Sequence, residues 1–477
     1  MAVSYETYGQ WIDNQYQLSS DRMNVTNKFT DSVIAEVSVA TKEEYVKMEE
    51  SAVQASRHLL STYERYEILK KAADLLKDRQ QQFGEIIAAE VGKSISEATG
   101  EAGRAALTLE VSAEEAKRIQ GEVVPVESAP GSENRQAFTI KEPVGVIGAI
   151  TPFNVPLNLV CHKLGPALAS GNAVILKPAE VTPLSALKLA ELLKEAGLPE
   201  GWLHVITGKG KEIGTWMTES ERIQMITFTG SPSVGLWLKQ RAGHKKVSLE
   251  LGNNSAVIVH KDADIKKAAE QVAQKSFNNA GQVCISVQRV FVHKEIKASF
   301  LKEVKHYTEA LVTGDPFEKE TQVGPMISKE ALKRVQQWIT EAVDLGAQVL
   351  TGNETDGNLL KPTVLVDPPQ HAKVCQEEVF GPVVSILEYE TEEEAIDFVN
   401  QSKYGLQAGL FTNDLTFIMR AAKEIKVGGL IINDTSGYRV DHMPYGGLKE
   451  SGEGKEGPKY AMQEMMNERL IVLQPAE

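Results

Sequence analysis

The chain has 477 residues, of which 42% are hydrophobic and 24% charged, with 37 glycines. This length predicts two or three domains with sizeable apolar cores, and the composition excludes a disordered or fibrous protein. The 51 lysines and arginines stand against 65 aspartates and glutamates, and the resulting net charge of −14 argues against nucleic acid as a partner.

The first residues, MAVSYETYGQWIDNQ, lack a basic start followed by an apolar run, and no run of about 18 apolar residues occurs. We therefore expect neither a secretory signal nor a membrane partner. The three cysteines, Cys161, Cys284 and Cys375, match neither a disulfide framework nor a zinc-binding spacing. Free thiols favour a reducing compartment, so we expect a cytoplasmic protein without a bound metal.

Residues 41–120 carry apolar side chains at intervals of three and four residues, which predicts a set of amphipathic helices. Residues 121–143 change to alternating apolar residues around a Pro-Gly-Ser turn, which predicts two strands or an arm. Strands and helices then alternate over residues 144–243 and 247–389, which indicates parallel sheets with helices on both faces. The tail MNERLIVLQ is a predicted strand, and together with the arm it could complete a sheet in another subunit.

The turn FTGSPSVG, residues 228–235, lies between an apolar strand and a helix. Gly230 and Ser231 stand at the start of that helix, where backbone N–H groups and the positive end of the helix dipole favour a phosphate. The spacing is G-x-x-x-x-G and not the dinucleotide fingerprint, so an ordinary turn with a serine cap explains it equally well.

Lys177 and Glu180 follow the predicted strand AVILK, at the edge where ligands of parallel sheets gather. Both side chains could bind ribose hydroxyls there, and a solvated charged pair is the alternative. A carboxylate in this place accepts from a free 2′-hydroxyl and repels a 2′-phosphate, which favours NAD over NADP.

Three residues are candidates for covalent chemistry. Cys284 follows a Gly-Gln turn signal in NAGQVCIS, and an ionised thiol is a strong nucleophile, although a lone cysteine is more often a small buried hydrophobe. Glu250 ends a predicted strand before a Gly-Asn-Asn turn and is a candidate general base, with ion pairing as the alternative. Asn154 lies between two prolines in TPFNVPLNL and could donate its amide to an oxyanion or bond its own turn.

Taken in order, TPFNVPLNL, ILKPAE, FTGSPSVG, LELGNNSAVIV, GQVCIS, EEVFGPVV and MPYGGLKESGEG resemble the motifs of the NAD(P)-dependent aldehyde dehydrogenases, in their lactaldehyde dehydrogenase-like branch. The resemblance covers nearly the whole chain, with the base and nucleophile 34 residues apart (284 − 250). It implies an α/β fold with a Rossmann-like dinucleotide-binding domain, an α/β catalytic domain and a small β oligomerisation arm. The implied ranges are 1–120 with 143–246 for NAD binding, 247–440 for catalysis, and 121–142 with 455–477 for an arm that pairs subunits into a homodimer or homotetramer.

By this resemblance Cys284 attacks the aldehyde carbonyl, and the Asn154 amide together with the Cys284 backbone N–H holds the oxyanion of the thiohemiacetal. Hydride then passes to NAD, with NADP as a possible cofactor, and a thioester remains. Glu250 activates the water that hydrolyses the thioester to a carboxylic acid. Relatives that pass the acyl group to coenzyme A generally lack this glutamate, so a free acid is the expected product.

The resemblance also implies a cofactor site. The matched positions are Lys177 and Glu180 at the adenosine ribose, Gly230 and Ser231 near the pyrophosphate, Glu378 and Phe380 at the nicotinamide ribose, and Pro152 and Phe153 along the same crevice. Phe380 has a core position as its alternative. Lys163 matches a lysine of the family, and a solvated helix face explains it equally well. Cys161 and Cys375 are expected to be structural.

Tyr438, Arg439 and His442 lie in the loop SGYRVDHMPYGG, near the substrate mouth of the family, and could face a small anionic or hydroxylated aldehyde. The expected substrate is a short polar aldehyde such as lactaldehyde, sulfolactaldehyde or a semialdehyde, with Arg439 as its anchor. The alternative is that Arg439 pairs with Asp441 or with a neighbouring subunit.

Two other classes of protein are compatible with parts of this pattern. One is a structural protein that binds NAD without turnover, and an intact set of Asn154, Glu250 and Cys284 argues against it. The other is a cysteine-dependent hydrolase or acyltransferase, which needs a histidine close to the thiol. None of the nine histidines lies in a motif that marks such a partner.

Overall fold

Four helices lead into the first sheet, as the apolar spacing of residues 41–120 predicts. The computed structural model describes residues 5–474. The four helices are α1 (Lys42–Arg57), α2 (Thr62–Asp78), α3 (Gln80–Val91) and α4 (Ile95–Ala116). Thr41 and Ser61 are the N-cap residues of α1 and α2, and both form capping boxes. In each, the hydroxyl accepts a hydrogen bond from the backbone N–H of a glutamate three residues later, and the carboxylate of that glutamate accepts from the backbone N–H of the N-cap residue.

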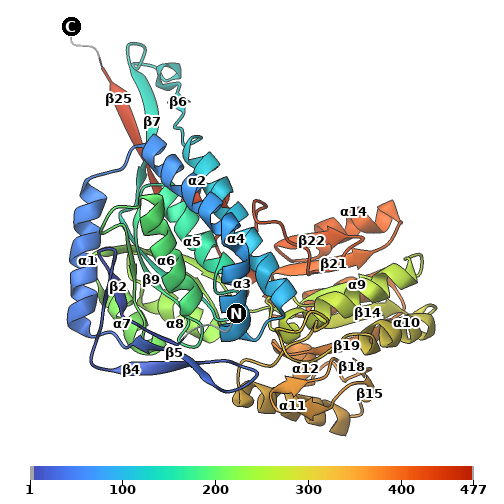
Figure 1. The fold of residues 1–477 in the computed structure, drawn as a ribbon. Coiled ribbons are helices and arrows are strands. Elements are labelled where there is room, and N and C mark those ends of the chain that lie inside the picture. Colours follow the sequence, from blue (N-terminus) through green and yellow to red (C-terminus); the bar gives the residue numbers. More distant parts are fainter. Residues whose placement is uncertain (1–4, 475–477) are drawn as a thin grey trace.

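An eight-stranded sheet forms the centre of the first part of the molecule (Figure 1). Its strands in spatial order are β24 (Gly452–Glu453), β12 (Lys246–Glu250), β11 (Ile223–Thr229), β8 (Val146–Ile150), β9 (Ala173–Lys177), β10 (Leu203–Val205), β2 (Gln10–Ile12) and β3 (Gln15–Gln17). The strands from β12 to β10 are mutually parallel. One face packs against α5 (Asn158–Ala169), α6 (Leu184–Ala196) and α2 to α4, and the other against α1, α7 (Gly210–Glu219) and α8 (Pro232–Arg241). The predicted parallel sheet with helices on both faces is therefore confirmed.

The strand order reverses between β8 and β11. From β8 the chain adds β9 and β10 on one side, and it then returns to add β11 and β12 on the other. Ligands of open parallel sheets bind in the crevice beyond the carboxyl ends of the strands at such a point. The loops after β8 and β11 carry Asn154 and Gly230, so the topology places both residues at this crevice.

The second part of the molecule contains a seven-stranded sheet. Its spatial order is β15 (Gln348–Thr351), β18 (Thr363–Val366), β19 (Val383–Tyr389), β14 (Arg289–His293), β13 (Ala256–Val259), β21 (Gln407–Phe411) and β22 (Gly429–Ile432). All neighbours are parallel except β15, which runs antiparallel to β18. The helices of this part are α9 (Ile265–Phe277), α10 (Lys297–Glu309), α11 (Lys329–Asp344), α12 (Lys373–Gln376), α13 (Glu392–Asn400) and α14 (Leu415–Glu424). A separate apolar core lies between these strands and helices.

The strand β12 belongs to the first sheet. It pairs with β11 as far as Thr229 opposite Glu250, and β24 pairs with its other edge. From the sequence we placed residue 247 onward in the catalytic domain. The structure places residues 247–250 in the first, eight-stranded sheet because their backbone groups complete its hydrogen-bonded ladder. Glu250 therefore ends a strand of the first sheet, where the chain passes to the second.

The arm is a three-stranded sheet that projects from the first part (Figure 1). It consists of β6 (Val123–Val124), β7 (Gln136–Pro143) and β25 (Met466–Leu473). The strand predicted in the tail is confirmed, and it pairs antiparallel with β7 of the same chain, from Met466 opposite Pro143 to Leu473 opposite Gln136. One edge of the arm is thus the strand β25.

The remaining elements are short. They are β1 (Glu6–Tyr8), β4 (Arg22–Thr26) and β5 (Val33–Ser38), the hairpin of β16 (Thr355–Asp356) and β17 (Leu359–Leu360), the pair β20 (Tyr404–Gly405) and β23 (Leu448–Lys449), the helix α15 (Pro458–Glu464), and the turns η1 (Val126–Ser128) and η2 (Asn278–Gly281). Within residues 5–474, no helix is long and apolar enough to cross a membrane.

Candidate active site

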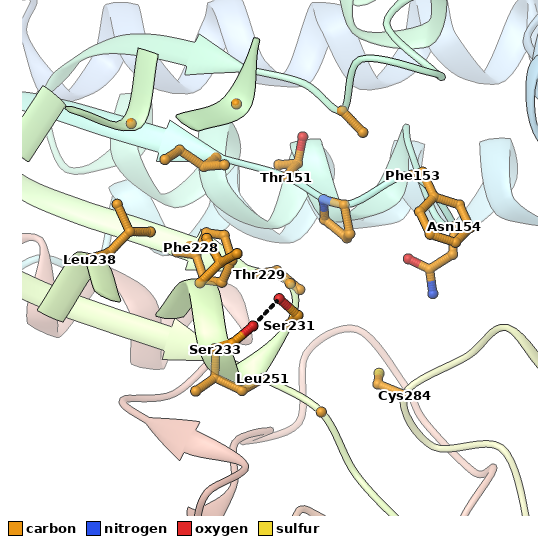
Figure 2. A pocket seen from close by; sticks show the side chains of 18 of the residues that line it. Thr151, Phe153, Asn154, Phe228, Thr229, Ser231, Ser233, Leu238, Leu251 and Cys284 are labelled. Carbon is orange, nitrogen blue, oxygen red and sulfur yellow. Dashed lines mark hydrogen bonds between the residues drawn. The ribbon is translucent and has the colours of Figure 1, made fainter. Parts of the chain in front are cut away.

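A cavity of about 780 Å³ lies at the crevice beyond β8, β9, β11 and β12 and reaches the second part of the molecule (Figure 2). Nine of the residues predicted from the sequence line it, namely Pro152, Phe153, Asn154, Lys177, Gly230, Ser231, Cys284, Glu378 and Phe380. Figure 2 shows the Asn154 amide and the Cys284 thiol pointing toward one another across the open space. The fold thus gathers the predicted nucleophile, the predicted oxyanion donor and seven of the eight predicted cofactor residues around one cavity, whereas Glu180, Glu250 and Arg439 do not line it.

Cys284 lies on a loop that follows η2. Three successive residues of that turn, Asn279, Ala280 and Gly281, have left-handed φ values of 49°, 53° and 68°. Such a run is unusual for residues other than glycine, and active-site loops are a frequent place for it. Glycine is needed at 281 because an added Cβ would lie 2.1 Å from the carbonyl oxygen of Gly381. The turn therefore holds the nucleophile loop against the EEVFGP segment.

Asn154 ties the loop after β8 to the nucleophile loop. Its Nδ2 donates to the carbonyl oxygen of Gln282 at 2.7 Å, and the Nδ2 of Asn279 donates to the Asn154 carbonyl at 3.2 Å. The side chain is buried and does not simply bond its own turn. Because an amide nitrogen carries two N–H groups, one remains that can donate to an oxyanion in the cavity.

The Cys284 thiol has a phenol as its hydrogen-bonding partner. Its Sγ lies 3.0 Å from the Oη of Tyr445. Burial raises the pKa of Cys284 to about 11, while the Tyr445 hydrogen bond and the charge of Arg439 act in the opposite direction. The thiol is therefore protonated at neutral pH in the free enzyme. A cysteine hydrolase would instead pair its thiol with a histidine.

Glu250 is buried, with an exposed fraction of 4%, and neither of its carboxyl oxygens has a hydrogen-bond partner within residues 5–474. Burial, reinforced by the negative charge of Glu456, raises the pKa of Glu250 well above its usual range, while Arg439 and Lys163 oppose that rise. A carboxyl group in such surroundings has the raised pKa that suits a general base near neutral pH. The part of the chain that the structure describes offers Glu250 no ion pair, which was the alternative left open by the sequence.

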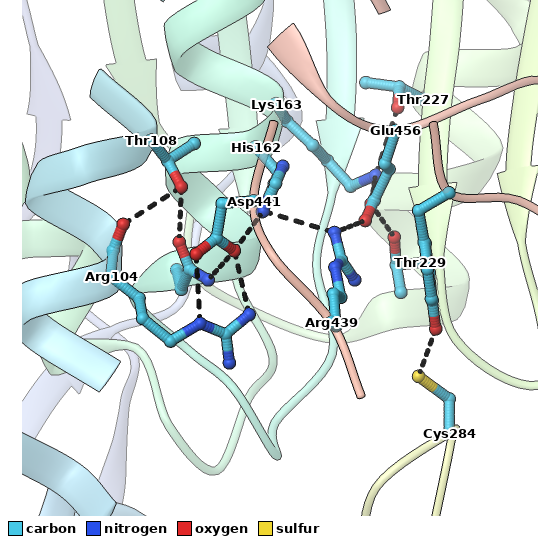
Figure 3. A network of polar contacts seen from close by, with 12 residues as sticks. Arg104, Thr108, His162, Lys163, Thr227, Thr229, Cys284, Arg439, Asp441 and Glu456 are labelled. Atoms are coloured by element: carbon cyan, nitrogen blue, oxygen red, sulfur yellow. Dashed lines mark hydrogen bonds and ion pairs between the residues drawn. The ribbon is translucent and has the colours of Figure 1, made fainter. Parts of the chain in front are cut away.

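A buried network of charges lies beside the thiol (Figure 3). The Nη2 of Arg439 donates to the Oε2 of Glu456 at 2.9 Å and lies 3.2 Å from the Nε2 of His162. Its guanidinium lies 3.7 Å from the centre of the Tyr445 ring. The Nζ of Lys163 lies 3.5 Å from the other oxygen of Glu456. Because Lys163 is only 2% exposed, its interpretation as a solvated helix residue is wrong.

Asp441 pairs with Arg104 and not with Arg439, so the predicted alternative of an Arg439 to Asp441 pair is wrong. The Nε and Nη2 of Arg104 donate to the two Asp441 oxygens at 3.0 and 2.8 Å, and His162 and Asn158 each contact the same carboxylate at 2.9 Å. Burial acts to raise the pKa of Asp441, but its bonds to His162 and Arg104 hold that pKa well below the usual range. The two loop residues therefore have different partners. Asp441 contacts side chains of α4 and α5, and Arg439 contacts Glu456.

Tyr438 and His442 lie on the same loop but are exposed, Tyr438 by 44%, and neither lines the cavity that holds Cys284. Several residues of this network were not identified from the sequence, namely Arg104, His162, Tyr445 and Glu456. The motif MPYGGLKESGEG contains Tyr445 and ends just before Glu456, so the segment was recognised. These two side chains were missed because a tyrosine in such a segment usually packs in the core and a glutamate is usually exposed to solvent.

Residues suited to a dinucleotide line the other half of the cavity. Lys177 is buried, and burial lowers the pKa of its amine to about 8. Its neighbour Glu180 is exposed and accepts from the backbone N–H of Gly210, the first residue of α7, at 2.5 Å. Ser231 is the N-cap residue of α8, where the helix dipole favours a phosphate. The backbone N–H of Gly230 is not free for a phosphate, because it donates to the carbonyl of Glu250.

The boundary between the two sheets is crossed by an aromatic contact. The Phe153 and Phe380 rings meet edge to face with centres 5.7 Å apart. Phe380 has a φ of 48°, which is a rare conformation for a bulky residue, and it lines the cavity instead of lying fully in the core. Glu378, on the same segment, accepts from the backbone N–H of Asn253 at 2.9 Å, and burial raises its pKa to about 7. Cys161 and Cys375 are buried in the two cores, as expected of structural residues.

The fold and this arrangement of residues are those of an aldehyde dehydrogenase. A model of the aldehyde dehydrogenase family matches residues 14–471, and the chain belongs to that family. It is an oxidoreductase that oxidises aldehydes with NAD or NADP as cofactor. The family, fold class and class of reaction predicted from the sequence are confirmed.

Similar proteins cover almost the whole chain. A 3-sulfolactaldehyde dehydrogenase of Priestia aryabhattai is 61% identical over 98% of both chains, and a lactaldehyde dehydrogenase of Methanococcus vannielii is 39% identical over 97% of this chain and 99% of its own. Aldehyde dehydrogenase 21 of Physcomitrella patens, solved with the reaction product succinate, has a TM-score of 0.96 and 38% identity over 99% of both chains. The glyceraldehyde-3-phosphate dehydrogenase of Methanocaldococcus jannaschii, solved with NADP, has a TM-score of 0.92 and 37% identity over 96% of this chain and all of that one.

Proposed function

We propose that Cys284 is the nucleophile, that the Asn154 amide and the Cys284 backbone N–H hold the oxyanion, and that Glu250 is the general base of thioester hydrolysis. The observation that carries the roles of Cys284 and Asn154 is the shared cavity, in which the thiol faces the amide. Glu250 does not line this cavity, and its proposed role is supported by its buried carboxyl group, which has no hydrogen-bond partner within residues 5–474. Lys177, Glu180, Ser231 and Glu378 hold the cofactor, which accepts a hydride when it is bound. Pro152, Phe153, Gly230 and Phe380 shape the cofactor crevice.

The proposed substrate is a short polar or anionic aldehyde, with the anionic 3-sulfolactaldehyde as the first candidate and lactaldehyde or a semialdehyde as the others. The relative from Priestia aryabhattai that carries this activity in its name is 61% identical over nearly the full length. The neighbour from Physcomitrella patens holds the dicarboxylate succinate as its product. Arg439, whose guanidinium lies over the ring of the tyrosine that contacts the Cys284 thiol, supplies the positive charge that a sulfonate or carboxylate tail needs.

Arg439 is the proposed anchor of the anionic group. Its Nε is buried and has no hydrogen-bond partner within residues 5–474, so one N–H of the guanidinium is unpaired. In Arg439→Met, we expect kcat/KM for sulfolactaldehyde to fall about 30-fold more than kcat/KM for neutral lactaldehyde, because a charge-assisted hydrogen bond is lost only with the anion.

The informative quantity is the ratio of kcat/KM for sulfolactaldehyde to kcat/KM for lactaldehyde. Removing Arg439 also leaves Glu456 buried without its partner, and that defect acts on both aldehydes alike. Equal losses for the two aldehydes would therefore rule out Arg439 as the anchor and leave it as a structural partner of Glu456.

NAD is the proposed preferred cofactor. Glu180 stands at the edge of the adenosine end of the cavity and would accept from a free 2′-hydroxyl. We expect kcat/KM with NAD to exceed that with NADP, and we expect Glu180→Gln to reduce this ratio by about tenfold, since like-charge repulsion of the 2′-phosphate is removed. The glutamine can still accept from Gly210. Glu212→Gln, an exposed glutamate of α7, is the matched control, and a higher kcat/KM with NADP in the wild type would contradict the proposal.

The protein is proposed to act as a homodimer or homotetramer in the cytoplasm. Two sheets present edge strands, β25 in the arm and β22 in the second sheet, and Leu470, Val472 and Leu473 of β25 are exposed. An edge strand with apolar side chains is a ready site for pairing with another chain. A mass near that of one 52.3 kDa chain in light scattering would contradict this proposal. The three free cysteines support a reducing compartment.

A further inference from the structure

We propose that the Tyr445 hydroxyl is a catalytic group that donates a hydrogen bond to the Cys284 sulfur and stabilises its thiolate. The two residues are 161 positions apart in the chain, yet their polar atoms lie 3.0 Å from each other. Tyr445 is 3% exposed, so its hydroxyl has little access to bulk water. This role of Tyr445 rests on Cys284 as the proposed nucleophile and is the same whichever aldehyde is the substrate.

The direction of this hydrogen bond follows from the chemistry of the two groups. Burial raises the pKa of Tyr445 well above its usual range, so the phenol stays protonated and remains able to donate. A thiolate can only accept. A hydrogen bond to a charged acceptor is roughly twice as strong as one between neutral groups, and it is stronger still away from water. Tyr445 therefore favours the ionised sulfur over the neutral thiol without bringing a formal charge of its own.

Arg439 strengthens this donor. Its guanidinium lies over the face of the Tyr445 ring, 3.7 Å from the centre, where a cation is attracted by the ring electrons. Such a cation draws electron density from the ring, which makes the phenolic O–H a better donor. Glu456 holds the guanidinium in this place by accepting a hydrogen bond of 2.9 Å from its Nη2. The buried network in Figure 3 thus reaches the nucleophile through a single tyrosine.

The test uses Tyr445→Phe, which removes only the hydroxyl. Alkylation of Cys284 by iodoacetamide is measured at pH 8 on the enzyme without aldehyde or cofactor, with the modified residue identified by mass spectrometry. Loss of a hydrogen bond to the thiolate is expected to raise the thiol pKa by about one unit, which lowers the thiolate fraction about tenfold. The higher nucleophilicity of a more basic thiolate offsets part of this, so we expect alkylation to slow by about three- to tenfold.

Tyr307→Phe, in a half-buried tyrosine of α10, is the matched control and should alkylate at the wild-type rate. A Tyr445→Phe enzyme that reacts as fast as the wild type, or faster, overturns the proposal. Incorporation of 3-fluorotyrosine at position 445 provides a second test that keeps the ring and the fold. A more acidic phenol is a stronger donor and should accelerate alkylation, whereas an unchanged or slower rate contradicts a donor role.

Discussion

Replacement of Cys284 by alanine is expected to abolish the formation of reduced cofactor with every aldehyde, with a loss in kcat of at least about 10⁴-fold. The reason is that hydride can leave only from the tetrahedral adduct that the sulfur forms with the carbonyl carbon. The measurement is the absorbance of reduced nicotinamide in the steady state. The variant should still bind NAD, because Cys284 lies at one end of a cavity whose cofactor residues come from β9, β11 and α8.

Cys375→Ala is the matched control, since Cys375 is buried in the core of the second sheet and does not line the cavity. It should keep activity within about threefold of the wild type, at some cost in stability. The wild-type rate should rise with pH near neutrality, because burial raises the pKa of Cys284 to about 11 and only the thiolate attacks. Substantial turnover by Cys284→Ala would exclude the covalent route, and a wild type inactive toward all aldehydes would favour a structural protein that binds NAD.

Glu250→Gln is expected to release about one reduced cofactor per active site in a burst and then to turn over about 10²- to 10⁴-fold more slowly than the wild type. The variant can still form the thioester, but it lacks the base that activates water. Rapid mixing that follows reduced nicotinamide measures both phases. Glutamine has the shape of glutamate, and neither carboxyl oxygen of Glu250 has a hydrogen-bond partner within residues 5–474, so the fold should tolerate the change.

The control for this variant is Glu453→Gln, in a half-buried glutamate on β24 that pairs with Lys239 and lies beside the same strand. It should show neither a burst nor a loss of turnover. Thioester hydrolysis by the wild type should accelerate with rising pH as Glu250 ionises, since burial raises the pKa of this carboxyl, and that pH dependence should be absent from the slow phase of Glu250→Gln. Steady-state turnover at the wild-type rate in Glu250→Gln would exclude this residue as the base.

Much of the site could be read from local sequence because the relevant signals are local. The predicted strand and helix on either side of FTGSPSVG indicated that Ser231 lies at the start of a helix. The predicted strand VGVIGAITP indicated that Asn154 follows the carboxyl end of a strand. Parallel strands then bring such ends to a common edge. The position of Phe380 in the cavity also followed from its motif, although a bulky residue in a left-handed conformation could not have been predicted from propensity.

The partners of the charged residues could not be predicted in the same way. Arg439 stands two residues from Asp441, and the sequence offered that pair as an alternative, yet Arg439 binds Glu456 and Asp441 binds Arg104. Which charges meet depends on the direction in which each loop residue points once distant segments have packed. For a similar reason, residues 247–250 were assigned to the catalytic domain from the sequence although they pair with β11 in the first sheet. The sheet to which a strand belongs depends on backbone pairing with distant residues, which local sequence patterns do not show.

The sequence by itself determined the fold class, the helix starts and the candidates for nucleophile and base, because caps, periodicity and motif order depend on neighbouring residues. Only the tertiary structure decided what surrounds the nucleophile. The contacts from Tyr445 to Cys284, from Arg439 to Glu456 and from Glu378 to Asn253 join segments far apart in the chain. They are strong because folding removes these groups from water, and until the chain has folded that low-dielectric environment does not exist.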